Sequence, residues 1–369
     1  MNYLIDQQEQ LDQLFARANK AKVVGVDTEF LREKTYYAKL CLIQLGIGDD
    51  QFCIDVLQIE DLSVVAQIFR DPTILKIFHA ASQDLEVLYQ FFGELPEPVY
   101  DTQLAAAFCG ADLQLGYGAI VEEMLDIKLD KDQARTDWSK RPLSDAQLAY
   151  AADDVAYLEP LYALTSDKLE SQSKTSWYAE DLAVLANADQ YKFEVDEAYH
   201  RLSGGALRVT EQYRLQALAT WREQTAQQRD IPRTWVIKDR AMYDIAVKYP
   251  RSPSALLDMG LLGRKSGPYM APKIVNLLRQ ASSGIDKNSK PIWRRVEPLS
   301  KPQKQFCSGL MQKTADIAEN ENIAQALLGT RKTIESLFRH KQSDKLLSGW
   351  RTDVIGKPLL AQIEANDAL

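Results

Sequence analysis

The chain has 369 residues, of which 46% are apolar and 26% charged, and this length and balance favour a soluble globular protein of two or three domains. Its net charge of −8 divides into −20 over residues 1–200 and +12 over residues 201–369. An acidic half could collect divalent cations, and a basic half suits a polyanion. The alternative is that surface charge simply differs between domains. We expect neither a signal peptide nor a membrane span. The four cysteines form no CxxC pair and the chain has only three histidines, which argues against a Cys/His zinc site. Cysteines of this kind are typical of a cytoplasmic protein.

The first 165 residues alternate strand-like and helix-like segments. Three apolar runs follow one another with short gaps, and the sequence GIGDD between the second and third is a good hairpin turn. Later runs are separated by helical patterns, which predicts a meander followed by βαβ units in a mixed sheet. The expected strands lie at 23–30, 40–47, 52–56, 75–78 and 99–100, and helical patterns lie at 62–69 and 84–92.

From about residue 158 onward the strand signals end and the chain reads as helical. We expect an α/β domain over residues 1–200, with its core in residues 1–165 and connecting helices after it. Two all-helical domains should follow at 207–285 and 292–369, joined by the polar linker SSGIDKNSKP. Both helical segments contain a Trp-Arg pair, which favours duplicated modules without proving a repeat.

Two acids stand in the first expected strand, in the sequence VDTEF. Side chains alternate along a strand, so Asp27 and Glu29 should point to one face and Thr28 to the other. Two carboxylates that close repel each other, and either one takes up a proton or a cation holds both. Taken alone, the pair also fits a frayed strand end with solvated acids.

Further acids lie at strand-to-helix junctions. Asp84 stands near the start of a helix, where it could be a cap or complement the helix dipole. Asp101 also follows a strand and precedes a helix, and we interpret it as an N-cap without a functional role. Tyr150 and Asp154 are four residues apart in a helical segment and therefore share one helix face.

A site made of carboxylate oxygens, in a chain with only three histidines, suits hard cations such as Mg²⁺ or Mn²⁺. Two such ions roughly 4 Å apart are the standard apparatus for displacement at phosphorus. A tyrosine hydroxyl on the same face could orient the attacking water. The carboxylates of this hypothesis are Asp27, Glu29, Asp84 and Asp154, with Tyr150 beside the last.

These residues resemble a known family. VDTEF, HAASQDLEVL and YAADDVAYL resemble the three motifs of DEDD exonucleases, and the Y-x3-D spacing of the third is that of the DEDDy branch. The segments YYAKLCLIQLG and RTDWSKRPLSDAQLAYAADD resemble ribonuclease D in particular. The basic helical segment YRLQALATWREQTAQQRDIPRTW resembles the HRDC module. The resemblance runs over essentially the whole chain.

The resemblance implies a ribonuclease H-like exonuclease domain followed by two HRDC-type helical domains. It implies a metal-dependent 3′→5′ exoribonuclease that binds RNA with a free 3′ end, including tRNA precursors, and releases 5′-mononucleotides. Oligomeric state is not readable from the sequence, and a monomer is the working expectation.

The family arrangement also implies a role for each matching residue. Asp27 would bridge two divalent cations, Glu29 and Asp154 would serve the ion on the side of the nucleophile, and Asp84 would serve the other. Tyr150 would position the attacking water. His79, where many members of the wider superfamily have asparagine, is expected to be a hydrogen-bonded structural residue.

Contacts with RNA are expected from phosphate binding and base stacking rather than base-edge recognition. The candidates precede the third motif: Lys131, Arg135, Trp138 and Arg141. Core packing is the alternative for Trp138, and anchoring of the following helix, with Ser144 as its N-cap, is the alternative for Arg141. The aromatic residues Trp221, Trp235 and Trp350 are expected in helical cores.

Two other functions share these residues. A proofreading-type DNA exonuclease would use the same acids, but the ribonuclease D-like middle segment argues against it. An RNA-binding scaffold with an inactive exonuclease fold is disfavoured because the four carboxylates and the tyrosine are all present.

Overall fold

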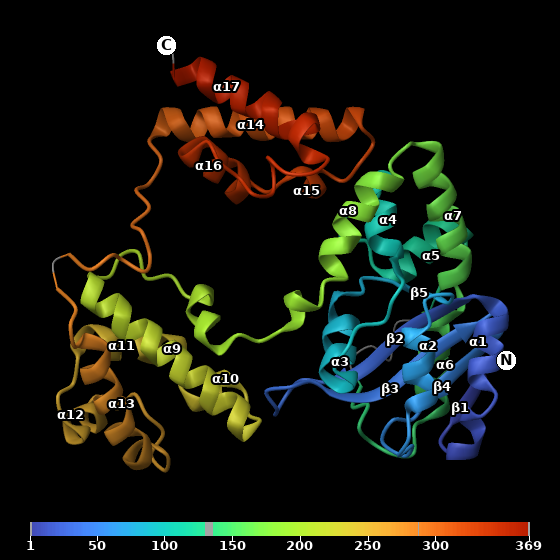
Figure 1. The fold of residues 1–369 in the computed structure, drawn as a ribbon, viewed down its shortest axis with the longest axis horizontal. Coiled ribbons are helices and arrows are strands. Elements are labelled where there is room, and N and C mark those ends of the chain that lie inside the picture. The colour runs from blue at the N-terminus through green and yellow to red at the C-terminus, as the bar shows by residue number, and fades with distance from the viewer. Residues whose placement is uncertain (1, 130–135, 287, 368–369) are drawn as a thin grey trace. The chain divides into compact units, whose positions relative to one another are not determined.

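The computed structural model describes residues 2–129, 136–286 and 288–367, which form two compact units (Figure 1). The first unit comprises residues 1–31, 40–191 and 299–369, and the second comprises residues 32–39 and 192–298. The domain limits inferred from the sequence stay predictions. In the described part of the chain, no helix combines the length and apolar character needed to cross a membrane.

A mixed sheet of six strands lies in the first unit, in the order β1-β4-β3-β2-β5-β6. β3 and β4 are antiparallel and meet at a turn where Gly48 has φ of 59°, while β5 is parallel to β2 and β6 is parallel to β5. The predicted meander and βαβ arrangement is therefore confirmed. The strands are β1 (Asn2–Ile5), β2 (Val23–Leu31), β3 (Lys39–Ile47), β4 (Asp50–Ile54), β5 (Leu75–Phe78) and β6 (Val99–Asp101).

Two glycines allow a helix to lie close to this sheet. A Cβ atom at Gly46 in β3 would lie 2.6 Å from the carbonyl oxygen of Val155, and one at Gly25 in β2 would lie 3.1 Å from the same oxygen. Glycine at both positions therefore lets the end of α6 approach the two central strands. The helices of this part are α1 (Leu14–Ala21), α2 (Ser63–Arg70), α3 (Ser82–Phe92), α4 (Thr102–Phe108), α5 (Tyr117–Leu125), α6 (Asp145–Ala156), α7 (Leu158–Ser171) and α8 (Thr175–Leu185).

The C-terminal helices share a hydrophobic core with helices of the part that carries the sheet. Trp350 stacks on Trp177 of α8 with ring centroids 4.6 Å apart, and its ring meets Phe108 of α4 at 5.4 Å. The guanidinium of the next residue, Arg351, donates two hydrogen bonds to Asp181. Residues 299–369 thus pack as part of the first unit. Their helices are α14 (Lys301–Asn320), α15 (Gln325–Leu328), α16 (Arg331–His340), the π-helical turn η4 (Thr352–Gly356) and α17 (Lys357–Asp367).

The second unit is helical around its own core, in which α9 contacts most of the other helices. The loop of residues 32–39, which joins β2 to β3, also belongs to it. In that loop the Tyr36 hydroxyl donates to Glu223 of α9, and the Tyr36 and Tyr37 backbone N–H groups donate to Asp230. The helices are η3 (Val195–Arg201), α9 (Val209–Arg229), α10 (Arg233–Val236), α11 (Asp239–Lys248), α12 (Pro253–Asp258) and α13 (Gly267–Ser282).

Candidate active site

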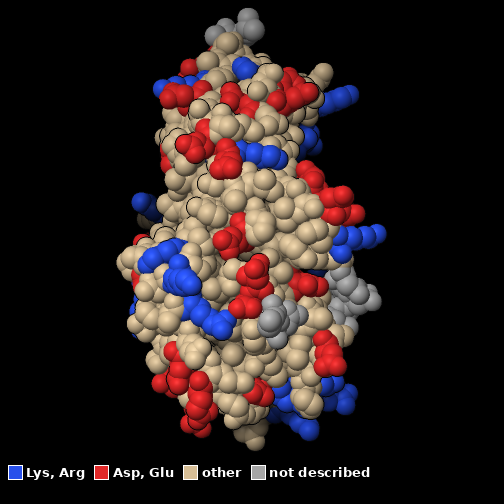
Figure 2. All heavy atoms as spheres, turned by 90° about the vertical axis from the view of Figure 1, so that its right-hand side faces the viewer, with Lys and Arg blue, Asp and Glu red and all other residues tan. Residues whose placement is uncertain are grey.

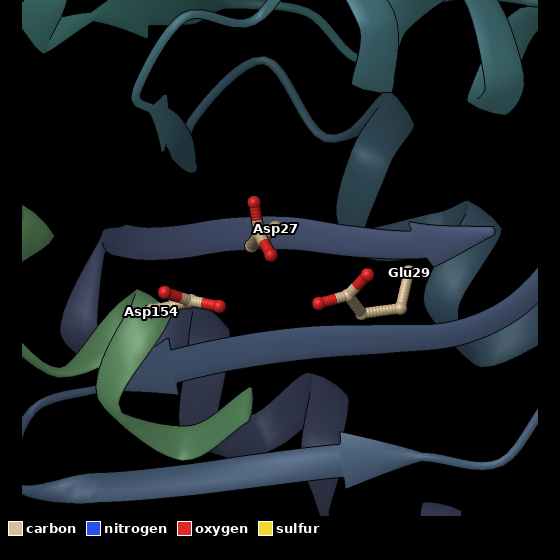
Figure 3. Close-up of side chains that lie close together, drawn as sticks. All are labelled: Asp27, Glu29 and Asp154. Carbon is tan, nitrogen blue, oxygen red and sulfur yellow. The ribbon is translucent and has the colours of Figure 1, made fainter. Parts of the chain in front are cut away.

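Three carboxylates meet beside strand β2. Asp27 and Glu29 project from β2 and Asp154 projects from α6, and one oxygen of each lies within 4.8 Å of the others. Figure 3 shows the carboxylates of Glu29 and Asp154 turned toward each other, with Asp27 between them along the strand. The alternation of strand side chains accounts for the placement of the first two acids.

Helix α6 delivers the third acid together with a tyrosine. Ser144 caps the helix through a capping box with Gln147, which confirms the cap inferred from the sequence. One helical turn separates Tyr150 from Asp154, and the two side chains are close enough that each alters the pKa of the other. The Tyr117 hydroxyl donates to the carbonyl oxygen of Asp153 at 3.0 Å, which fixes the end of the helix.

Asp84 lies beside this group of three but does not belong to it. It is buried in the first turn of α3, and its Oδ1 accepts a hydrogen bond from the Thr28 hydroxyl at 2.5 Å. Its charge is close enough to raise the pKa of Asp27. Thr28 therefore holds Asp84 from β2, between the two acids that point to the other face of that strand.

The four acids repel one another in a buried place. Burial, followed by the charges of Asp84, Asp154 and Glu29, raises the pKa of Asp27 well above its usual value. Burial and the neighbouring aspartates raise the pKa of Glu29 to about 9. Burial is also the main cause of the raised pKa of Asp84 and of Asp154, each about 7. At neutral pH such a group binds protons unless a cation compensates its charge.

The donor set fits divalent cations of the hard class. Each nearby ligand atom is a carboxylate oxygen, and Gln44, buried in β3, adds an amide whose Nε2 donates to Asp27 Oδ2 at 3.3 Å. The causes that raise the pKa of Asp27 and Glu29 are burial and other acids, so positive charge is what the group lacks.

The expected RNA contacts of Trp138 and Arg141 are wrong. Trp138 exposes only 2% of its surface and packs with Cys41 and Ala151, so its ring cannot stack on a base. Arg141 directs all five of its N–H donors to protein acceptors. They are the Asp55 carboxylate and the carbonyl oxygens of Cys41, Trp138 and Lys140. The alternative of core packing is confirmed for Trp138, and Arg141 is held by Asp55, by β3 and by the loop before α6.

The remaining RNA candidates, Lys131 and Arg135, lie outside the described residues. His79 is hydrogen-bonded as expected: Nδ1 lies 2.9 Å from Thr102 Oγ1, and Nε2 lies 2.9 Å from the Leu115 carbonyl oxygen. Thr28 and Gln44 were not singled out by the sequence, because their contacts with the acids join segments far apart in the chain.

Comparison with known families identifies two segments of the chain. Residues 3–170 match the family described as 3′-5′ exonuclease, and residues 211–278 match the HRDC domain. Ribonuclease D of Granulibacter bethesdensis is 34% identical over 365 residues, covering 97% of this chain and 91% of the relative. Ribonuclease D of Jannaschia sp. is 35% identical, covering 100% and 97%.

A solved structure agrees with these relatives. Escherichia coli RNase D, described as an exoribonuclease involved in structured RNA processing, superimposes with a TM-score of 0.87 at 30% identity and 99% coverage of both chains. The catalytic core of RRP6 from Trypanosoma brucei, at 22% identity and a TM-score of 0.58, shares the fold over 76% of this chain.

Proposed function

Because the chain belongs to the ribonuclease D family and is a 3′→5′ exoribonuclease, we propose that it trims the 3′ ends of structured RNAs such as tRNA precursors, releasing 5′-mononucleotides by two-metal-ion hydrolysis. The observation that carries this proposal is the buried group of Asp27, Glu29 and Asp154, whose raised pKa values call for compensating cations. The solved relative's role in structured RNA processing supports the substrate class.

The residues that would hold the cations are Asp27, Glu29, Asp154 and Asp84. When bound, divalent cations in such a site neutralise charge on the scissile phosphate and lower the pKa of an attacking water. The charges of the other three acids all raise the pKa of Asp27. It is therefore the residue proposed to serve both ions, with Mg²⁺ or Mn²⁺ as the candidates.

Tyr150 is the proposed positioning group for the water. Burial first, and then the charges of Asp154 and Glu29, raise the pKa of its phenol, so it remains a neutral hydrogen-bonding hydroxyl at neutral pH. A neutral hydroxyl one helical turn from a ligand carboxylate is suited to orient a water near that carboxylate.

Attraction for the RNA backbone is proposed to come mainly from the second unit. Residues 192–298 contain 19 Lys and Arg against 11 Asp and Glu, whereas residues 299–369 contain 10 against 8. On the face drawn in Figure 2, acidic and basic side chains are interspersed over the described residues. The charge contrast along the chain therefore does not by itself mark an RNA path on this face.

Digestion of a tRNA carrying extra 3′ nucleotides tests the proposal. With Mg²⁺ we expect stepwise shortening from the 3′ end, 5′-mononucleotides as products and a stop near the mature end. EDTA should abolish the reaction and added Mg²⁺ should restore it. A matched DNA oligonucleotide is the control: its digestion at the same rate, or RNA digestion in EDTA, would overturn the proposal.

A further inference from the structure

The turn that leads to Asp84 has an unfavourable backbone conformation. Ala80, between β5 and α3, has φ of 60°, a left-handed conformation that costs a residue with a Cβ free energy. Helix α3 begins two residues later and carries Asp84 in its first turn. The position of that acid therefore depends on contacts that hold this turn from outside.

Asp101, at the end of β6, supplies such contacts. Its Oδ1 accepts from the Ala80 N–H at 3.2 Å and its Oδ2 from the Ala81 N–H at 2.9 Å. The same carboxylate caps α4 by accepting from the N–H groups of Gln103 and Leu104. A cap requires only the last two bonds, so the first two are additional. Only 4% of Asp101 is exposed, so water contributes little to satisfying these donors.

Asp84 is thus restrained from two directions. The Thr28 hydroxyl fixes its carboxylate from β2, and Asp101 fixes the backbone from which α3 starts. Register brings these elements together: β5 lies between β2 and β6, and Phe78 at its end pairs with Asp101. Neighbours that orient a ligand in this way commonly change metal affinity or activity when they are altered.

We propose that Asp101 is a positioning residue for the exonuclease reaction, which holds the Ala80–Ala81 turn so that Asp84 faces Asp27 and can share a cation. This inference rests on the proposed metal-dependent function. It extends the sequence interpretation of Asp101, which assigned it the cap of α4 alone. The carboxylate touches neither substrate nor cation and acts through the backbone of α3.

Asparagine at position 101 should keep the cap of α4 and lose one of the two contacts with the Ala80–Ala81 turn. Oδ1 accepts from three of the four N–H groups, those of Ala80, Gln103 and Leu104. Oδ2 accepts from the Ala81 N–H alone. With its oxygen at Oδ1, asparagine keeps the cap of α4 but places an NH₂ group against the Ala81 N–H. Asp71→Asn is the matched control, since Asp71 Oδ1 accepts from the Thr73 N–H at 2.8 Å in a turn before β5.

The test measures Mn²⁺ binding to the full-length protein by electron paramagnetic resonance, together with kcat, KM for RNA and the melting temperature. For Asp101→Asn we expect the weakest-bound Mn²⁺ to bind about 10- to 100-fold more weakly, and kcat to fall by a similar factor. KM should be unchanged, and raised Mg²⁺ should restore part of the activity. Asp71→Asn should bind Mn²⁺ and turn over RNA as the wild type does.

A lower melting temperature with unchanged Mn²⁺ affinity and kcat would overturn the inference and leave Asp101 as a cap. If asparagine prevents folding, Asp101→Ser replaces it, because serine keeps an N-cap hydroxyl and loses the second oxygen. The results expected for Asp101→Asn, and the result that would overturn the inference, then apply to Asp101→Ser. Because Mn²⁺ binding is measured without RNA, a wild type that fails to digest RNA would contradict the proposed function and not this inference.

Discussion

Glu29 illustrates, at the scale of single residues, how the site affects the fold. Its pKa of about 9, and the values of about 7 for Asp84 and Asp154, mean that the folded chain retains protons that the unfolded chain releases near pH 4. Where the folded state binds more protons than the unfolded state, stability falls as the pH rises. The metal-free protein should therefore lose stability between about pH 4 and about pH 9.

The first prediction concerns cations and pH together. The increase in melting temperature caused by Mg²⁺ should be larger at about pH 8.5 than at about pH 5.5, because ionised acids bind the cation and protonated acids do not. Calorimetry with Mg²⁺ or EDTA at both pH values measures it. An increase of equal size at both values, or a larger one at low pH, would contradict a cation held by these acids.

The sequence predicted the placement of these residues where the geometry of a single strand or helix was enough. Strand alternation places Asp27 and Glu29 on one side, and a spacing of four places Tyr150 beside Asp154. It did not find the bond from Thr28 to Asp84, because that contact spans 56 residues of chain. For the same reason it left Trp138 open between an RNA contact and core packing, although the ring is buried.

At the scale of elements, the close approach of α6 to the sheet depends on Gly46. A methyl group there would lie 2.6 Å from the Val155 carbonyl oxygen, one residue after Asp154. Since this contact is with backbone, α6 itself would have to shift. Sequence patterns predicted both elements but not how closely they pack, and β1 was missed because four residues show too little alternation.

For Gly46→Ala we predict a loss of about 1–3 kcal/mol of stability and a lower kcat, because the shift of α6 displaces Asp154 and Tyr150. Gly309→Ala in α14 is the control, since a Cβ at Gly309 meets no atom within 4 Å. Urea unfolding and RNA turnover measure both effects. A Gly46→Ala protein with wild-type turnover would show that the helix position tolerates the added methyl group.

At the scale of the whole molecule, residues 299–369 form part of the core of the first unit. Trp350 is 7% exposed and packs on Trp177 and Phe108, whereas Trp235 in the second unit is 61% exposed. The sequence prediction that Trp235 lies in a core is therefore wrong, and those for Trp350 and the partly buried Trp221 are confirmed. Helical patterns do not reveal which partner a helix packs against, so the shared core was not predicted.

Trp350→Ala should therefore destabilise the exonuclease part by about 3–5 kcal/mol, as for other large buried aromatic side chains. Trp235→Ala is the matched control and should change stability little. Thermal inactivation of RNA turnover measures the effect on the catalytic part. Equal inactivation temperatures for the two variants would show that residues 299–369 do not support the exonuclease core.

The most direct test of the central claim is turnover by Asp27→Asn on a 3′-extended tRNA in Mg²⁺, with circular dichroism to establish folding. Asparagine has nearly the same shape but removes the charge that three neighbouring acids surround. We predict a folded protein whose turnover is lower by orders of magnitude, since the proposed bridge between the cations is lost. Turnover near that of the wild type in Mg²⁺ would contradict the account.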